Sequence, residues 1–236
     1  QRVSRQNRLV SIRFGEDLQR LPRAWFERFA IRRLVLPASV SSIDGSTFVG
    51  SDSLRCVDLR SALGLRSIGS RAFCECGRLD RVFLNDGLEM IGQECFSDTA
   101  VEEVTIPRSV RLIGSHAFYH CSLLKRVSFE DGAPTTIEPF TFAGSGLQSF
   151  TALRSLRQLQ KCVFSGCKAL KCADLSGLSE ERLSDGLFED SAVETVVLQR
   201  ALRTIGERTF AGCKQLRSLD FGADSVLEEI RSKAFQ

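Results

Sequence analysis

The chain has 236 residues, 43% of them hydrophobic, and its 32 Lys and Arg residues against 29 Asp and Glu residues give a formal net charge of +3. This composition supplies enough apolar side chains for a large core and excludes an intrinsically disordered chain. The weak positive charge does not suit a dedicated nucleic-acid binder. No uncharged apolar run approaches the roughly 18 residues that a membrane-spanning helix needs, so no membrane insertion is expected.

The N-terminal segment QRVSRQNRLV lacks the apolar stretch of a signal peptide. Because the chain begins with Gln1 and ends at Gln236 directly after the residues KAF, we expect a fragment of a longer protein. An apolar triplet already appears near this end, at Leu9, Ile12 and Phe14. Its spacing is that of the triplets described below, so the repeat is predicted to extend through the N-terminus.

One phenylalanine recurs along the whole chain at intervals of 22 to 25 residues. A fixed period of this length indicates a solenoid or a propeller. The recurring residues are Phe26, Phe48, Phe73, Phe96, Phe118, Phe142, Phe164, Phe188, Phe210 and Phe235. An aliphatic residue stands five positions before most of them, as at Ile43, Ile68, Ile91, Ile113, Ile137, Leu159, Leu183, Ile205 and Ile230.

An apolar triplet follows each of these phenylalanines up to Phe210, as in Leu79, Val82 and Leu84. The last two members are separated by one residue, which is the alternation of a β-strand. Each unit is therefore predicted to contain one short strand, a polar return, and a tight turn or short helix that carries the Phe inward. Ser70 and Ser115, which follow glycines at the start of this turn, are predicted to cap such helices.

Units of two lengths alternate from Phe73 to Phe210, apart from the unit after Phe142, whose register the pattern leaves open. Long units place a cysteine three residues after the Phe, and short units place Ser or Thr there. The long-unit residues are Cys76, Cys121, Cys167 and Cys213, and the short-unit residues are Thr99, Ser145 and Ser191. Equivalent cysteines two units apart would be about 10 Å from one another, beyond the reach of a disulfide. We expect mostly reduced thiols that fill small spaces in the core.

Ordering one unit of about 23 residues costs on the order of 25 to 45 kcal/mol of backbone entropy. The burial of one Phe and a few aliphatic side chains, at roughly 1.5 to 3 kcal/mol each, does not offset this cost. The units must therefore stack, with neighbouring strands about 4.8 Å apart in a parallel sheet. The sequence predicts one α/β solenoid domain that spans residues 1–236 in about ten units.

The segment IPRSVRLIGSHAFYHCSLLKRVSF, residues 106–129, resembles the BspA-like leucine-rich repeat, also called the Treponema pallidum type. The resemblance covers essentially the whole chain. It implies a curved leucine-rich-repeat array, with a parallel β-sheet on the concave face and short helices or turns on the convex face. It also implies a surface antigen that binds other macromolecules, often in adhesion, and hence a cell-surface or secreted location. Reduced thiols and the lack of an Asn-x-Ser/Thr sequon keep a cytoplasmic location open.

Both histidines, His116 and His120, lie in the segment IGSHAFYHC. A pair four residues apart can bind zinc on a helix, but a site needs three or four ligands, and no further ligand stands at a matching spacing. We therefore predict ordinary turn surface and no metal or cofactor. No acid–base pair, phosphate-binding loop or nucleophile motif stands out, so an enzyme is not expected.

The residue between the last two members of each triplet is predicted to point outward from the sheet. This row contains an aromatic residue, Phe83, and the positions that precede the middle triplet residue are mostly basic. Aromatic and arginine side chains are favoured at protein interfaces. The candidate protein-binding surface consists of Arg33, Arg55, Asp58, Arg81, Phe83, Thr105, Arg126 and Ser128.

Two interpretations of this surface remain open. The first is a solubilising rim. The second is a patch formed by Phe83 with Arg81 and Arg126 that binds a protein partner, whose identity the sequence does not reveal. For the whole chain, the leading hypothesis is a non-enzymatic adhesion or surface-recognition module, and the alternative is an intracellular scaffold or assembly subunit.

Overall fold

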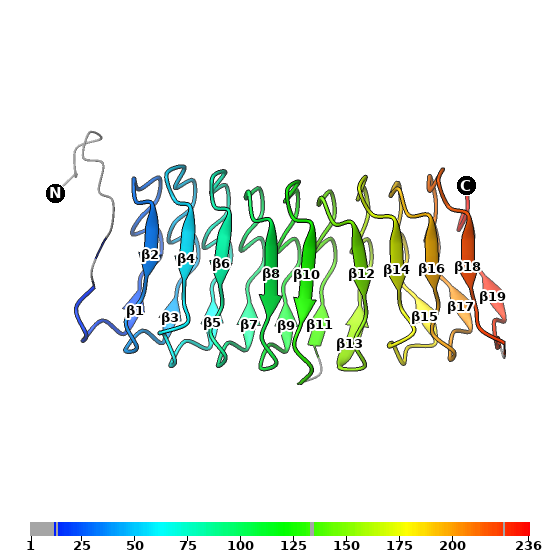
Figure 1. Cartoon of the computed structure of the whole chain (residues 1–236), viewed down its shortest axis with the longest axis horizontal. Helices are drawn as coiled ribbons and strands as arrows, with labels where there is room; N and C mark the ends of the chain where they lie inside the picture. Colours follow the sequence, from blue (N-terminus) through cyan, green and yellow to red (C-terminus); the bar gives the residue numbers. More distant parts are fainter. Residues whose placement is uncertain (1–11, 13, 133–134, 224) are drawn as a thin grey trace.

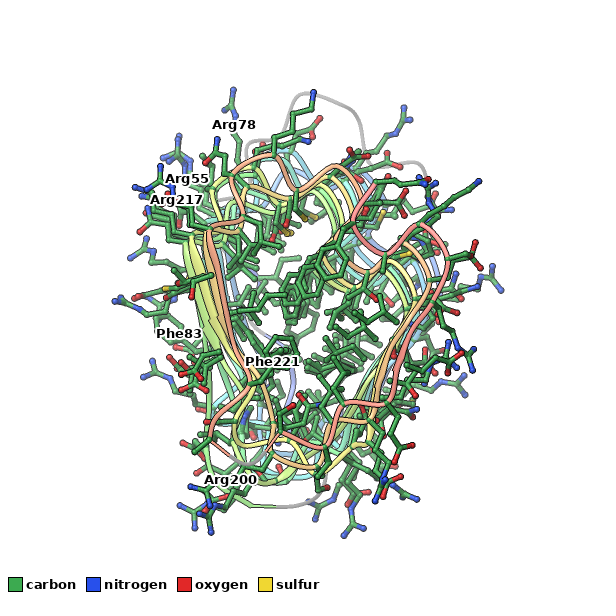
Figure 2. The ribbon with its side chains drawn as sticks, turned by 90° about the vertical axis from the view of Figure 1, so that its right-hand side faces the viewer. Arg55, Arg78, Phe83, Arg200, Arg217 and Phe221 are labelled. Carbon is green, nitrogen blue, oxygen red and sulfur yellow. The ribbon has the colours of Figure 1, made fainter. Side chains whose placement is uncertain are left out.

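The computed structural model describes residues 12, 14–132, 135–223 and 225–236. The predicted N-terminal triplet is described only in part, because Leu9 lies outside these residues. The described chain winds into a parallel-strand β-solenoid of about nine turns. Figure 1 shows the strands side by side in a row, and the view along the row in Figure 2 shows sheets on two opposite sides of a filled interior.

The longer strands form what we call the front sheet, in two hydrogen-bonded groups of five and four parallel strands. In chain order they are β2 (Arg33–Val35), β4 (Cys56–Asp58), β6 (Arg81–Phe83), β8 (Glu103–Ile106), β10 (Arg126–Phe129), β12 (Ser149–Thr151), β14 (Cys172–Asp174), β16 (Thr195–Val197) and β18 (Ser218–Asp220). In β2, β6, β8, β12 and β16 buried and exposed side chains alternate. The strands predicted from the apolar triplets are thus confirmed.

Mostly two-residue strands on the opposite side form the back sheet, in parallel groups of seven and three strands. In chain order they are β1 (Arg20–Leu21), β3 (Ser42–Ile43), β5 (Ser67–Ile68), β7 (Met90–Ile91), β9 (Leu112–Ile113), β11 (Thr135–Ile137), β13 (Leu156–Leu159), β15 (Arg182–Leu183), β17 (Thr204–Ile205) and β19 (Glu229–Ile230). The sequence pattern did not predict this sheet. From β3 onward, each of its strands ends on the aliphatic residue that stands five positions before the Phe.

The turn around each Phe is hydrogen-bonded to the next turn of the solenoid through alternate N–H groups, and the N–H groups between them bond within the turn. Around Phe48, the residues two positions before and after it, Ser46 and Gly50, have positive φ angles of 57° and 63°. The N–H groups of Ser46, Phe48 and Gly50 donate to carbonyl oxygens of the following turn at 2.8 to 2.9 Å. The same pattern recurs along the array and ties each turn to its neighbour.

The prediction of short helices was wrong, because the described residues contain no helix and the Phe lies in a turn. An α-helix needs each N–H to donate to the carbonyl four residues earlier, and in the Phe turn alternate N–H groups bond across to the next turn. Ser70 and Ser115 therefore cap no helix. The Ser115 N–H donates to Glu138 Oε2 at 2.8 Å.

The recurring phenylalanines form a continuous stack through the core. Consecutive ring centroids lie between 5.1 Å, for Phe26 and Phe48, and 6.1 Å, for Phe142 and Phe164, with interplanar angles of 3° to 19°. The rings from Phe48 to Phe210 are at most 2% exposed. Since no turn can bury its ring alone, stacking of successive turns creates the core.

The position three residues after the Phe forms a second column, made of thiols and hydroxyls. Cys121 Sγ donates to the carbonyl of Phe96 at 3.0 Å and lies 3.3 Å from Thr99 Oγ1. Cys167 and Cys213 repeat both contacts with the turn before each of them. The alternation of Cys with Ser or Thr therefore supplies hydrogen-bond partners to backbone carbonyls inside the solenoid.

Candidate protein-binding surface

The eight predicted surface residues all lie on the first five strands of the front sheet or directly beside them. Arg33, Arg81 and Arg126 belong to one row across β2, β6 and β10. The residues of a second row, two positions further along their strands, are Asp58, Phe83, Thr105 and Ser128, and Arg55 directly precedes β4. Figure 2 shows Phe83 on the outer side of the front sheet and Arg55 at its rim. The structure thus brings the eight residues together on one face.

Asp58 is the one buried member of this set, with 7% of its surface exposed. Arg33 Nη2 lies 3.2 Å from its carboxylate, and Arg60 donates to it through Nε and Nη2 at 2.9 and 2.8 Å. The Arg60 hydrogen bonds lower the pKa of Asp58 more than any other favourable contact, against an opposing effect of burial. Asp58 is therefore an anion that positions two guanidinium groups and is not itself a free contact group.

Arg60, which the sequence analysis missed, is the cation that lies against Phe83. Its Cζ is 4.5 Å from the centroid of the Phe83 ring, a cation–π geometry, and the ring remains 38% exposed. Arg60 stands two residues after Asp58, so continuing the strand alternation by one step would have placed it on the outer face. Arg81 instead lies 3.2 Å from Asp80, and Arg126 pairs with Glu103.

The ion pairs of β6, β8 and β10 border a groove of about 590 Å³ on the front sheet. Lys125 Nζ lies 3.2 Å from Glu102, parallel to the Arg126–Glu103 pair. The groove is lined by Asp80, Arg81, Glu102, Glu103, Lys125, Arg126, Gln148 and Ser149. Exposed pairs of this kind add little stability, and their charged groups can exchange partners when another molecule binds.

The two histidines lie away from this face, in the turn around Phe118. Both have positive φ, 59° for His116 and 54° for His120. The His116 ring stacks on Phe140 at 4.9 Å, and His120 Nδ1 lies 3.7 Å from Asp98. Within the described residues, no group of three or more His, Cys, Asp or Glu side chains is placed to hold a metal ion.

All nine cysteines are in the described part of the chain, and none is bonded to another. Burial raises the pKa of the Cys121 and Cys167 thiols to about 11 and that of Cys76 to about 12. These side chains are therefore protonated hydrogen-bond donors near neutral pH and are not activated nucleophiles. Cys172, on β14 of the front sheet, is exposed.

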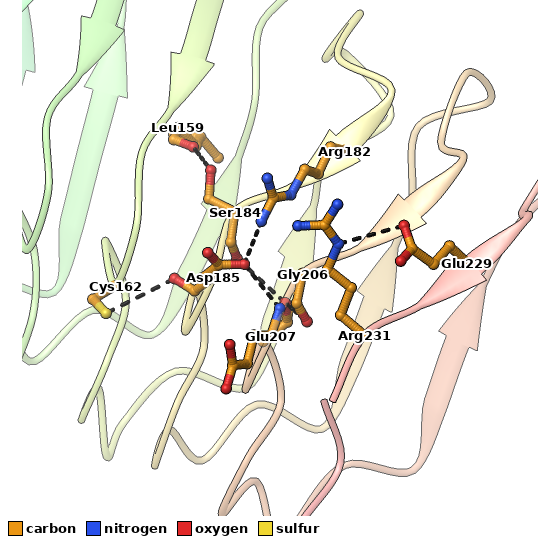
Figure 3. A network of polar contacts seen from close by, with 10 residues as sticks. Leu159, Cys162, Arg182, Ser184, Asp185, Gly206, Glu207, Glu229 and Arg231 are labelled. Carbon is orange, nitrogen blue, oxygen red and sulfur yellow. Dashed lines mark hydrogen bonds and ion pairs between the residues drawn. The ribbon is translucent and has the colours of Figure 1, made fainter. Parts of the chain in front are cut away.

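A second polar region lies on the back sheet, where β13 and β15 belong to different hydrogen-bonded groups. A groove of about 560 Å³ there contains Glu180, whose pKa burial raises to about 7. Figure 3 shows the adjoining network, in which Asp185 accepts from Arg182 at 2.5 Å and from the Glu207 N–H at 2.8 Å. Burial opposes the ionisation of Asp185, but these hydrogen bonds leave its pKa below the ordinary value. The network joins three turns of the solenoid.

The sequence pattern of the BspA type leucine rich repeat region matches this chain in six copies, over residues 4–125, 54–171 and 181–236. A leucine-rich repeat protein from Bacteroides ovatus is similar at 21% identity and a TM-score of 0.50, over 96% of this chain and 72% of that one. A leucine rich cell surface protein from Faecalibacterium prausnitzii is similar at 18% identity and a TM-score of 0.53, over 96% and 70% of the two chains.

A leucine-rich repeat protein of T. pallidum is 24% identical with a TM-score of 0.51, over 78% of this chain and 77% of that one. At these identities the likeness concerns the fold alone. No curated protein matches the chain. Among the described residues, no helix has the length and apolar character to cross a membrane.

Proposed function

The chain belongs to the BspA-type leucine-rich repeat family, and we propose that it is a non-enzymatic protein-binding module that recognises its partner through the front sheet. The observation that carries this proposal is the alignment of the outward side chains of five hydrogen-bonded strands, β2 to β10, in straight rows. The stacked core holds these strands rigidly, so a partner meets side chains that are already in position. No catalytic family is indicated by the match.

The partner is a protein outside the cell, and the module serves adhesion or recognition at a cell surface. The similarity of the fold to a leucine rich cell surface protein supports this part of the proposal. An intracellular scaffold is the second candidate, and the nine unpaired cysteines favour it, since reducing compartments keep thiols free. Titration of free thiols in protein isolated from its native source separates the two, because nine free thiols would support the scaffold.

The test compares two double variants that differ in the face they change. Phe83→Ala with Arg81→Glu alters the front sheet. Met90→Ala with Arg111→Glu alters the back sheet, where Met90 on β7 is 38% exposed, as is Phe83. Both variants and the unmodified protein are used to capture partners from surface proteins and from cell extract, and the affinity of each captured partner is then measured.

We expect the front-sheet variant to lose at least about tenfold in affinity, the effect of removing one interface anchor, and the back-sheet variant to bind normally. Unchanged binding by the front-sheet variant, or equal losses in both variants, would refute the proposal. Thermal unfolding of both variants serves as the control for folding.

A further inference from the structure

The ratio of positive to negative side chains in the ion pairs of the front sheet differs between its first three strands and the rest of the sheet. Over β2, β4 and β6, each aspartate is shared by two arginines, so each group retains one unbalanced positive charge. These groups are Asp58 with Arg33 and Arg60, and Asp80 with Arg55 and Arg81. Further along the sheet the ion pairs are one to one, namely Lys125–Glu102, Arg126–Glu103 and Arg217–Glu194. We call Arg33, Arg55, Arg60 and Arg81 the arginine patch.

Arg60 is the one cation of the arginine patch that contacts both a carboxylate and an aromatic ring. Two of its N–H donors bind Asp58, and its Cζ lies over the Phe83 ring, yet 61% of the side chain is exposed. A guanidinium carries five N–H donors, so three remain available to an incoming carboxylate. Because Asp58 and Phe83 already restrict the side chain, little rotamer entropy remains to be lost when a ligand binds.

A mostly apolar groove of about 580 Å³, with Glu16 and Ser61 among its lining residues, adjoins the arginine patch at the start of the front sheet. Arg33 belongs to its wall, and Val35, which is 41% exposed, lies on the same strand two residues further on. The other lining residues are Ile12, Phe14, Glu16, Leu36, Pro37, Ala38 and Ser61. An apolar side chain in this groove would therefore be next to a carboxylate bound by Arg33 or Arg60.

We propose that the arginine patch and this groove bind an acidic peptide segment of a protein partner, with carboxylates on Arg60 and Arg33 and one apolar side chain in the groove. Charge complementarity selects this occupant, because the patch retains positive charge and the ion pairs further along the sheet are one to one. The inference rests on the proposed function, since it names the chemistry of the partner for the same face.

The test uses three labelled peptides of twelve residues in a fluorescence anisotropy titration at low salt. The first has acidic residues on both sides of one Leu, the second has Lys in place of the acidic residues, and the third has Gly in place of the Leu. We expect the acidic peptide to bind, the Lys peptide not to bind, and the Gly peptide to bind about tenfold more weakly. Equal binding of the acidic and Lys peptides, or no binding of the acidic peptide, would overturn the proposal.

Three variants examine the role of Arg60, each with thermal unfolding as the folding control. Arg60→Gln should weaken the acidic peptide by about tenfold, the loss of one charge-assisted contact. Arg217→Gln, which removes a one-to-one paired arginine of the same sheet, should leave binding unchanged. Asp58→Asn adds positive charge but frees Arg60, and we expect weaker binding. Tighter binding by this variant, or an equal loss in Arg217→Gln, would contradict a preorganised site.

The outcomes for the peptide and for the partner separate the two proposals. If a captured partner depends on Phe83 and Arg81 while the acidic peptide does not bind, the proposed function stands and this inference falls. If no captured partner depends on the front sheet, the proposed function falls whatever the peptide does.

Discussion

Replacement of Phe118 by Ala should lower the free energy of unfolding by about 3 to 5 kcal/mol, the range for truncation of a buried phenylalanine. The Phe118 ring has no exposed surface and stacks between Phe96 at 5.3 Å and Phe142 at 5.6 Å. Phe235, at the end of the stack, has one stacked neighbour, at 5.4 Å, and is 49% exposed. Phe235→Ala should therefore cost only about 1 kcal/mol, which is roughly half of the ~1.5 to 3 kcal/mol gained by full burial of a Phe side chain.

Urea titration followed by circular dichroism measures both losses, and native-state hydrogen exchange locates them. Each turn contacts only its neighbours, so the fall in protection in Phe118→Ala should be largest in the turns of Phe96, Phe118 and Phe142. Equal losses for the two variants, or a cost below about 1 kcal/mol for Phe118→Ala, would refute the claim that stacked rings form the core.

Three further predictions concern titration, packing and thiol accessibility. The pKa of Glu180 is raised from its ordinary value of 4.5 to about 7, so the folded state binds more protons than the unfolded state between these pH values. The contribution of Glu180 to stability should therefore fall as pH rises from 4.5 to about 7, and Glu180→Gln should abolish this fall in melting temperatures measured across the pH range. A Cβ at Gly92 would lie 2.7 Å from the backbone of Gly69, whereas a Cβ at Gly77 would meet nothing within 4 Å. Gly92→Ala should therefore lower the melting temperature and Gly77→Ala should not, and equal effects of the two variants would contradict the close packing of turns at Gly92. In the native protein a thiol reagent should modify Cys172 first, and should modify Cys121 and Cys167 only on unfolding. Mass spectrometry identifies the modified residues, and early modification of Cys121 and Cys167 would contradict their burial in the thiol column.

The parts of the fold that the sequence predicted are those with one strong signal in every unit. Phe118 and its equivalents mark the period, and the pair Val82 and Leu84 shows the strand alternation of β6. The back sheet was missed because a strand such as Met90–Ile91 has two residues, too few for any alternation to appear. The helices were predicted wrongly because alternate N–H groups of the Phe turn bond to the next turn, and such bonds leave no local sequence pattern.

For the candidate surface, strand alternation was enough to place Phe83 and Arg81 on one face. The partners of each side chain depend on the register between turns, which is a tertiary property. Hence the sequence did not reveal that Asp58 binds Arg33, or that Arg60 lies over Phe83. The sequence was enough to predict which side chains of one strand face outward. It was not enough to predict contacts between residues more than 20 positions apart.

The most direct test of the front sheet as the recognition face is photo-crosslinking from single positions. The photoreactive residue p-benzoylphenylalanine is placed at Phe83 of the front sheet or at Met90 of the back sheet, two side chains that are each 38% exposed. The protein is then irradiated with its captured partner, and the products are identified by mass spectrometry. A covalent product from position 83 and none from position 90 is the predicted result. A product from position 90, with none from position 83, would show that the partner binds the opposite face.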